Sequence, residues 1–270
     1  MYKLICTDID GTLLNKEREL SGLTIQVLSE IRSKVSVVLA SSRMPKAMTR
    51  FQEQLGISGS PLIAYNGGLV IKNSRVIDSK TIPTNVLELL RENEFHQKCN
   101  VSVYFEDEWY ASTLDYWTKR EQNNTKVEPA ILPFDLVCSK FKKRSISAHK
   151  VMCMGDEITI SVISQLLTER FGAQLNLYRS KPTYLEISSS ETNKAIALDR
   201  LLTKKHPDIK MQDVLSFGDN YNDLELLQQS GLGIAVANGK EKVIAIADGV
   251  TESNLDDGVA KAIIKLKDKF

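Results

Sequence analysis

The N-terminal part of the chain alternates short apolar runs with segments in which apolar residues recur at helical spacing. Ile25, Leu28 and Ile31 show this spacing, and Ser21 precedes them as a candidate N-cap. The predicted elements are a strand over 2–8, a helix over 21–34, a strand over 35–40, a helix over 45–56, and a strand with a turn over 61–68. This order is typical of a parallel sheet whose crossovers are helices.

The C-terminal part repeats the same rhythm. The predicted elements are a helix near 191–205, a strand over 213–219, a helix at about 221–230 and a strand over 231–238. The two ends together therefore predict one α/β core domain with a doubly wound, Rossmann-like parallel sheet, formed by residues 1–82 and 188–270.

The middle of the chain has a different pattern, in which strands of alternating polarity stand among helices. The predicted strands lie within 101–112, 146–155 and 173–180, and the predicted helices within 83–98 and 157–172. Antiparallel strands with helices on one face suit this order. We therefore expect residues 83–187 to form an inserted α+β cap domain, in which Trp109 and Tyr110 serve strand packing rather than substrate contact.

The overall composition excludes several classes of partner. With 35 basic and 34 acidic residues the formal net charge is +1, so no broad field favours nucleic acid or an anionic membrane. No apolar run reaches the roughly 20 residues of a membrane span, and Asp8 comes too early for a signal peptide. We therefore expect a cytoplasmic protein, a monomer or weak homo-oligomer, that acts on a small molecule. The four cysteines form no CxxC pair and only three histidines are present, so carboxylates are expected to carry the chemistry.

Chemically useful side chains directly follow several predicted strands. Doubly wound sheets bind ligands beyond the carboxyl ends of their strands, so these positions are expected on one rim. They are Asp8 and Asp10 after the first strand, Ser41, Ser42 and Arg43 after the second, Asn66, Gly67 and Gly68 after the third, and Asp219, Asn222 and Asp223 after a later one. The closely spaced Asp8 and Asp10 bring like charges together. An Mg²⁺ ion held with Asp219 would offset that repulsion, because hard oxygen ligands suit it.

The two neighbouring aspartates also suit phosphoryl transfer. One carboxylate can attack phosphorus to form an aspartyl-phosphate, and a second can protonate the leaving oxygen and later activate water. Asp8 fits the first role and Asp10 the second. The charge on the transferred group calls for donors, which the Ser41 hydroxyl, the Ser42 backbone N–H and the Lys194 ammonium can supply.

Several segments carry a family resemblance. The segments DIDGT (8–12), LASSR (39–43), SSSETNK (188–194) and GDNYND (218–223) resemble, in order, the four motifs of the haloacid dehalogenase superfamily of phosphohydrolases. The position of the insert, together with AYNGG (64–68) and VTESNLDDGVA (250–260), resembles its Cof-type subfamily.

The resemblance implies a role for each matching residue. The implied roles are Asp8 as nucleophile, Asp10 as acid/base, Mg²⁺ on the Asp8 carboxylate, the Asp10 carbonyl and Asp219, phosphate on Ser41, Lys194 and Asn222, and Asp223 as a supporting residue. The chain departs from the common Thr-Gly-Arg of the family at Ser41-Ser42-Arg43, where Ser42 adds a side chain beside the phosphate. Arg43 stays open between a substrate contact and a pair with a structural carboxylate.

The sequence therefore predicts a Mg²⁺-dependent phosphatase that hydrolyses a small phosphate monoester, such as a sugar or nucleotide-related phosphate, through an aspartyl-phosphate. A phosphomutase stays open as an enzymatic alternative. A phospho-accepting signalling module is disfavoured by the chain length and by Asp10, since such modules resemble a single short domain without a second acid. We also expect the cap to be mobile, to select the substrate and to close over the core site.

Overall fold

The structure is a computed structural model that describes residues 1–179 and 181–270 in full. The chain divides into two compact units. Residues 1–78 and 192–270 form the core unit, and residues 79–191 form the insert. The insert therefore begins before and ends after the expected interval 83–187. No helix among the described residues combines the length and the apolar composition that a bilayer crossing requires.

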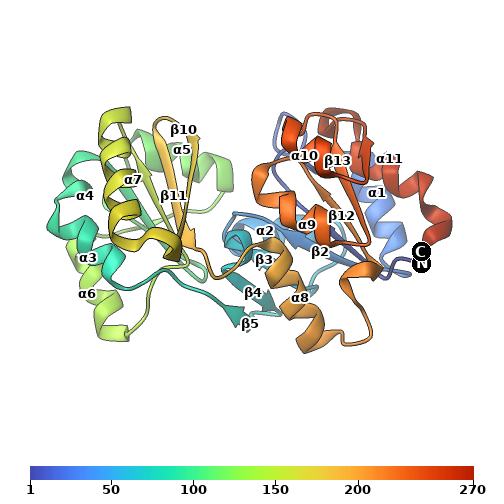
Figure 1. The fold of residues 1–270 in the computed structure, drawn as a ribbon, viewed down its shortest axis with the longest axis horizontal. Helices are drawn as coiled ribbons and strands as arrows, with labels where there is room; N and C mark the ends of the chain where they lie inside the picture. The colour runs from blue at the N-terminus through green and yellow to red at the C-terminus, as the bar shows by residue number, and fades with distance from the viewer. The chain divides into compact units, whose positions relative to one another are not determined.

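An eight-stranded sheet organises the core unit (Figure 1). Its strands are β1 (Leu4–Thr7), β2 (Ser36–Ala40), β3 (Leu62–Ala64), β4 (Leu69–Lys72), β5 (Arg75–Ser79), β12 (Val214–Gly218), β13 (Leu232–Val236) and β14 (Gly249–Thr251). They lie in the order β14-β13-β12-β1-β2-β3-β4-β5, and all pairs from β14 to β3 are parallel. β4 pairs antiparallel with β3. The prediction omitted β4, β5 and β14. β5 is largely exposed, so it lacks the apolar run that identifies a strand.

The helices of the core unit alternate with its strands, which confirms the predicted doubly wound α/β fold. They are α1 (Gly22–Ile31), α2 (Lys46–Gln54), α8 (Lys194–Lys205), α9 (Leu224–Gln229), α10 (Glu241–Ile246) and α11 (Gly258–Lys265). The Ser21 side chain accepts a hydrogen bond from the Thr24 N–H at 3.0 Å, as the predicted N-cap requires. Both faces of β1 are apolar, because Leu4 and Cys6 pack in one cluster with α8 while the fully buried Ile5 points to the other face.

The position of β1 decides where a ligand can bind. β1 lies between β2 and β12, and the strands that follow β1 and those that follow β12 extend the sheet in opposite directions. A crevice opens at such a switch point, outside the carboxyl ends of the strands. The Asp8 N–H donates to the Phe217 carbonyl at 3.1 Å and so continues the β1–β12 ladder by one residue. Asp8 therefore lies beside the end of β12, the strand that Asp219 follows.

A six-stranded sheet organises the insert. Its strands are β6 (Asn100–Phe105), β7 (Glu108–Ala111), β8 (Ala130–Ile131), β9 (Lys150–Met154), β10 (Leu175–Lys181) and β11 (Tyr184–Ser189), in the order β10-β11-β9-β6-β7-β8. Its helices are α3 (Asn85–Glu92), α4 (Phe95–Lys98), α5 (Tyr116–Thr125), α6 (Phe134–Arg144) and α7 (Glu157–Phe171). All pairs are antiparallel except β7–β8. Tyr110 lies in the apolar core, and Trp109 is buried and stacked on Tyr104, as expected for strand packing.

The insert differs from the prediction in several details, and the prediction omitted α5, α6, β8 and β11. The single helix expected over 83–98 is broken, because Glu94 adopts φ +54° between α3 and α4. The helices also do not all lie on one face of the sheet. Val101 points into the core shared with α3, α6 and α7, whereas the adjacent Asn100 donates to the Thr118 hydroxyl of α5 at 2.8 Å. Since α5 is almost entirely polar, it has no apolar stripe from which to predict it.

Candidate active site

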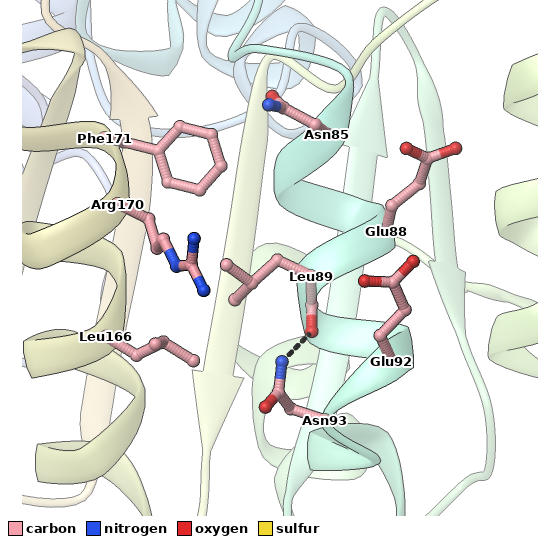
Figure 2. Close-up of a pocket in the computed structure, with 8 residues that line it drawn as sticks. All are labelled: Asn85, Glu88, Leu89, Glu92, Asn93, Leu166, Arg170 and Phe171. Atoms are coloured by element: carbon pink, nitrogen blue, oxygen red, sulfur yellow. Dashed lines mark hydrogen bonds between the residues drawn. The ribbon is translucent and has the colours of Figure 1, made fainter.

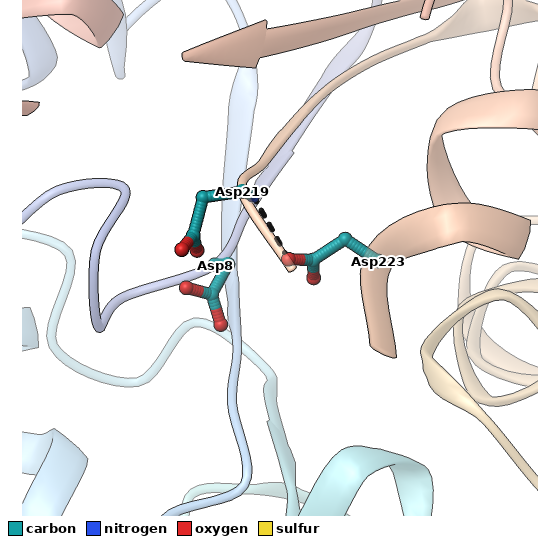
Figure 3. A group of neighbouring side chains, drawn as sticks. All are labelled: Asp8, Asp219 and Asp223. Atoms are coloured by element: carbon teal, nitrogen blue, oxygen red, sulfur yellow. Dashed lines mark hydrogen bonds between the residues drawn. The ribbon is translucent and has the colours of Figure 1, made fainter. Parts of the chain in front are cut away.

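Three carboxylates meet at the carboxyl end of β1 (Figure 3). Asp8 follows β1, Asp219 follows β12, and Asp223 ends the short 3₁₀ turn Tyr221–Asp223. One ligand oxygen from each lies within 4.8 Å of the others. Asp8 is 4% exposed and Asp223 is fully buried, so water screens their charges poorly.

Lys194 supplies the positive charge nearest to these carboxylates. Its Nζ lies 2.5 Å from Asp8 Oδ1 and 2.6 Å from Asp223 Oδ1, and the side chain is fully buried. Burial lowers the pKa of Lys194, but the carboxylates of Asp223 and Asp8 raise that pKa more, so it lies above the ordinary value. The lysine is therefore held as an ammonium ion between the two aspartates.

One ammonium does not balance three carboxylates. Burial raises the pKa of Asp8, and the charges of Asp223 and Asp219 raise it further, against the opposing effect of Lys194. Burial and the charge of Asp223 likewise raise the pKa of Asp219 to about 6. The cluster therefore carries two uncompensated negative charges when all three carboxylates are ionised.

This arrangement fits a divalent cation. The missing charge is that of one such ion, and the donors are carboxylate oxygens, which suit Mg²⁺ better than softer metals. Asp8 and Asp219 were both expected as ligands. The third carboxylate of the group is that of Asp223, which was expected as a supporting residue. Asp10 was expected to bind the metal through its backbone carbonyl, and its carboxylate lies outside the group.

The loop that carries Asp219 is fixed from two sides. The Asp223 carboxylate accepts hydrogen bonds from the backbone N–H groups of Asp219 and Asn220 at 3.0 and 3.1 Å. From the β1 side, the Thr12 hydroxyl donates to Asp219 Oδ1 at 3.0 Å. Thr12 was not among the residues predicted from the sequence, although it ends the DIDGT segment. Asp223 thus orders the loop in addition to contributing charge.

Asp10 is paired with Arg43. The guanidinium Nε and Nη2 donate to the two carboxylate oxygens at 2.6 and 2.7 Å, and Arg18 lies 3.7 Å away. Burial raises the pKa of Asp10, but the hydrogen bonds and charge of Arg43 lower it more, so it lies below the ordinary value. The sequence left Arg43 open between a substrate contact and a pair with a structural carboxylate. The structure contains a carboxylate pair, and its partner is Asp10, the predicted acid/base.

The turn after β3 joins two of the predicted phosphate-binding segments. The Asn66 N–H donates to the Ser41 carbonyl at 2.9 Å, and the Asn66 Oδ1 accepts from the Asn222 side chain at 2.9 Å. The buried Ser41 hydroxyl accepts from the Arg43 N–H at 3.2 Å, and Ser42 between them is half-buried. Asn66 adopts φ +54°, which asparagine tolerates better than most residues. The structure thus brings Ser41 and Asn222 together through Asn66.

The same turn also supports Lys194. Gly67 has φ +101° and lies so close to the Asn193 carbonyl that a Cβ atom would overlap with it. The Thr192 hydroxyl donates to the Gly67 carbonyl at 3.1 Å, and the Asn193 side chain caps α8 by accepting from the Ile196 N–H at 2.9 Å. Lys194 is the first residue of α8. The cap and the glycine contact therefore fix the backbone from which the Lys194 side chain extends.

A separate groove of about 380 Å³ lies in the insert between α3 and α7 (Figure 2). Leu89, Leu166 and Phe171 line it, together with Glu88 and Glu92 of α3 and Arg170 of α7. None of the residues that the sequence singled out for chemistry lines this groove. The residues that the sequence singled out for chemistry all lie in the core unit.

Known proteins resemble this chain in both sequence and fold. A family model described as haloacid dehalogenase-like hydrolase matches residues 5–263. A Haemophilus influenzae protein named "Putative phosphatase" is 31% identical over 100% of this chain and 99% of its own. The 5-amino-6-(5-phospho-D-ribitylamino)uracil phosphatase of Bacillus subtilis is 28% identical over 97% of this chain and 94% of its own. The crystal structure of a haloacid dehalogenase-like hydrolase from Bacteroides thetaiotaomicron superposes with a TM-score of 0.88 at 28% identity, covering 98% of this chain and 100% of that one.

Proposed function

Because the chain belongs to the haloacid dehalogenase superfamily, in its Cof-type group, we propose that it is a Mg²⁺-dependent phosphatase that hydrolyses a small phosphate monoester through an aspartyl-phosphate on Asp8. The Bacillus subtilis relative is named for a phosphorylated small molecule, which supports a substrate of this size. The observation that carries the proposal is the placement of Asp8. It is a buried carboxylate at the switch point of the sheet, beside a buried ammonium and two further carboxylates.

The proposed reaction has two steps at phosphorus. In the first, an Asp8 carboxylate oxygen forms a bond to phosphorus, the bond from phosphorus to the ester oxygen breaks, and Asp10 gives its proton to that oxygen. In the second, Asp10 takes a proton from water, the water oxygen bonds to phosphorus, and the bond to Asp8 breaks to release phosphate. General acid–base help of this kind is worth about 10² to 10⁴ in rate.

The Arg43 pair bears on the first step. A general acid must carry a proton, and Arg43 favours the charged form of Asp10. A phosphate ester bound beside Asp10 brings negative charge, which raises the pKa of a carboxyl group and opposes that effect. We propose that Arg43 keeps Asp10 in place. We also propose that substrate binding raises the pKa of Asp10, so that its carboxyl group is protonated and can act as the acid.

The remaining polar groups have proposed binding roles. Ser41, Ser42, Asn222 and Lys194 would hold the phosphoryl oxygens. Asp8, Asp219 and the Asp10 backbone carbonyl would hold Mg²⁺, with Asp223 as the residue that fixes the loop of Asp219. When bound, Mg²⁺ would neutralise charge on the transferred phosphoryl group. The insert, residues 79–191, is proposed to select the part of the substrate that leaves.

The test is an activity screen against a panel of phosphorylated metabolites with Mg²⁺ present. We expect Asp8→Asn to remove turnover, because an amide is a poor nucleophile, and Asp10→Asn to lose about 10² or more. The exposed Asp208 offers a matched control, since Asp208→Asn should retain full activity. Near-normal turnover by Asp8→Asn would contradict the proposal.

Metal removal tests the cofactor. Chelation should abolish hydrolysis, and excess Mg²⁺ should restore it. Ca²⁺ should fail to restore it, because its larger and looser coordination shell misplaces the nucleophile. Full activity in excess chelator would rule out the metal. Product analysis with a hexose phosphate separates a phosphatase, which releases inorganic phosphate, from a phosphomutase, which returns an isomeric ester.

A further inference from the structure

The turn after β13, residues 237–240, contacts both loops that carry the proposed metal ligands. The Asn238 side chain donates from Nδ2 to the Gly11 carbonyl at 2.8 Å. The Lys240 N–H donates to the Asp219 carbonyl, also at 2.8 Å. The turn therefore links the loop after β1 to the loop after β12.

A second asparagine extends this link. The Asn254 backbone N–H donates to Asn238 Oδ1 at 2.8 Å, and the Asn254 side chain donates from Nδ2 to the Leu14 carbonyl at 2.6 Å. Asn238 and Asn254 thus hold two carbonyls of the loop after β1, at Gly11 and Leu14, and are hydrogen-bonded to each other. We refer to these two residues as the asparagine strap.

The loop needs this support at Gly11. Gly11 adopts φ +84°, and its backbone passes so close to Asp219 that a Cβ atom would lie 2.5 Å from Asp219 Oδ2. A glycine meets these demands, but it restrains its own backbone less than any other residue. Contacts from outside must therefore fix the peptide after Gly11. Asp10, whose carbonyl is a proposed Mg²⁺ ligand, is the residue immediately before it.

We propose that Asn238 and Asn254 are positioning residues that hold the loop after β1 in register with Asp219, so that the Asp8 carboxylate, the Asp10 carbonyl and Asp219 bind one Mg²⁺ ion. The inference rests on the proposed function for the identity of the metal. Asn238 is exposed and Asn254 is half-buried, so neither serves the apolar core. Their side chains contribute hydrogen bonds to backbone carbonyls, which is a geometric role.

The experiment measures Mg²⁺ binding directly. Metal-free wild-type protein, Asn238→Ala and Asn254→Ala are titrated with Mg²⁺ alone in a calorimeter, and kcat and KM for a hydrolysed ester are measured over a range of Mg²⁺ concentrations. We expect the Kd for Mg²⁺ to rise about fivefold to tenfold in each variant, the size of effect that a lost hydrogen bond gives. At saturating Mg²⁺, KM for the ester should stay at its wild-type value. Asn93→Ala is the matched control, because Asn93 also donates to a backbone carbonyl, Leu89, but lies in the insert.

A near-isosteric variant separates positioning from folding. Asn238→Asp keeps the acceptor for the Asn254 N–H but cannot donate to the Gly11 carbonyl. A rise in the Kd for Mg²⁺ in this variant, with the thermal midpoint of the metal-free protein unchanged, supports the inference even if Asn238→Ala fails to fold. An unchanged Kd in the folded strap variants overturns it, whatever their phosphatase activity.

The two proposals fail in different ways. A wild-type protein that binds Mg²⁺ but hydrolyses no phosphate ester overturns the proposed function, and the Kd comparison still decides the role of the strap. A wild-type protein that binds no Mg²⁺ overturns both.

Discussion

At the residue scale, Arg43 is held more firmly than a surface cation. Its side chain is 5% exposed, and its Nε and Nη2 both donate hydrogen bonds to the Asp10 carboxylate. Its guanidinium carbon lies 5.5 Å from the Phe51 ring centroid. Lysine keeps the charge but cannot form this two-point contact. Substituting lysine for Arg43 therefore tests whether the orientation of the Asp10 carboxylate matters for turnover, in addition to the positive charge beside it.

We expect Arg43→Lys to lower kcat about tenfold or more, a part of the 10² to 10⁴ that acid–base help supplies, and to leave the Kd for Mg²⁺ unchanged. Arg50 is a matched control, because it also lies over Phe51, at 4.3 Å, but pairs with Glu19. Arg50→Lys should keep the wild-type kcat. If Arg43→Lys also kept it, Asp10 would not depend on this pair.

His149 gives the insert a dependence on pH. It is fully buried, its Nδ1 accepts from the Glu106 N–H at 3.2 Å, and its Nε2 lies 3.0 Å from the Ser79 hydroxyl. Burial lowers the pKa of His149 to about 4, from 6.5. Between these values the unfolded state takes up a proton that the folded state does not bind. The contribution of His149 to the free energy of unfolding is therefore fully present above pH 6.5 and is lost as the pH falls toward 4.

At pH 5 this effect should reduce the free energy of unfolding of the insert by roughly 2 kcal/mol relative to pH 7. Urea unfolding of the wild type and of His149→Gln at both pH values measures it. The variant lacks the titrating group, so its loss on acidification should be smaller by about that amount. Parallel pH profiles for the two proteins would show that His149 does not contribute.

At the element scale, the contact between the β3 turn and the start of α8 fixes Lys194. Gly67 is the residue through which they touch, with φ +101° and no space for a side chain beside the Asn193 carbonyl. Any change that separates the two elements should move the ammonium away from Asp8. The stability of this contact and the activity of the site are thus expected to fall together.

Gly67→Ala should destabilise the core unit by about 1 to 3 kcal/mol, because alanine strains at positive φ and must push the α8 terminus away. It should also reduce kcat. Gly22→Ala is the control: it lies in α1 with no atom within 4 Å of a new Cβ, so it should be neutral or stabilising. Denaturant midpoints and kcat measured on the same preparations decide between these outcomes.

At the scale of the whole molecule, the two units have separate apolar cores. The cluster around Val103, Val151 and Ile187 lies within the insert, and the cluster around Leu4, Val38 and Leu198 lies within the core unit. The two connections to the insert are also close together, since Lys80 and Glu191 form an ion pair at 2.7 Å. A short linker can therefore join residue 78 to residue 192.

We predict that a variant with this linker in place of residues 79–191 folds and slowly hydrolyses a small activated aryl phosphate when Mg²⁺ is present. Its discrimination among natural esters should collapse, if the insert selects the substrate. The measurement is the ratio of kcat/KM values across the ester panel, on a variant first shown to be folded by circular dichroism. A ratio equal to that of the full chain would assign selectivity to the core unit, around Ser42 and Arg43.

Local patterns in the amino-acid sequence were enough to predict most of the alternation of strands and helices in the core unit and the residues that follow its strands. Both depend on local periodicity, which a single segment of chain carries. The rim positions follow from the parallel order, so Asp8 and Asp219 could be expected at one edge of the sheet. Short exposed β5 and polar α5 were missed because neither has an apolar pattern.

Which side chains pair with one another became clear only from the three-dimensional fold. Lys194 bridges Asp8, 186 residues earlier, and Asp223, while Asp10 pairs with Arg43 instead of joining the carboxylate group. The Asn238 contact with Gly11 spans 227 residues. Such contacts depend on how loops from distant strands meet, because hydrogen bonds and ion pairs require atoms to lie within a few ångströms. A pattern along the chain fixes which residues reach the rim, and the packing of the loops fixes their partners.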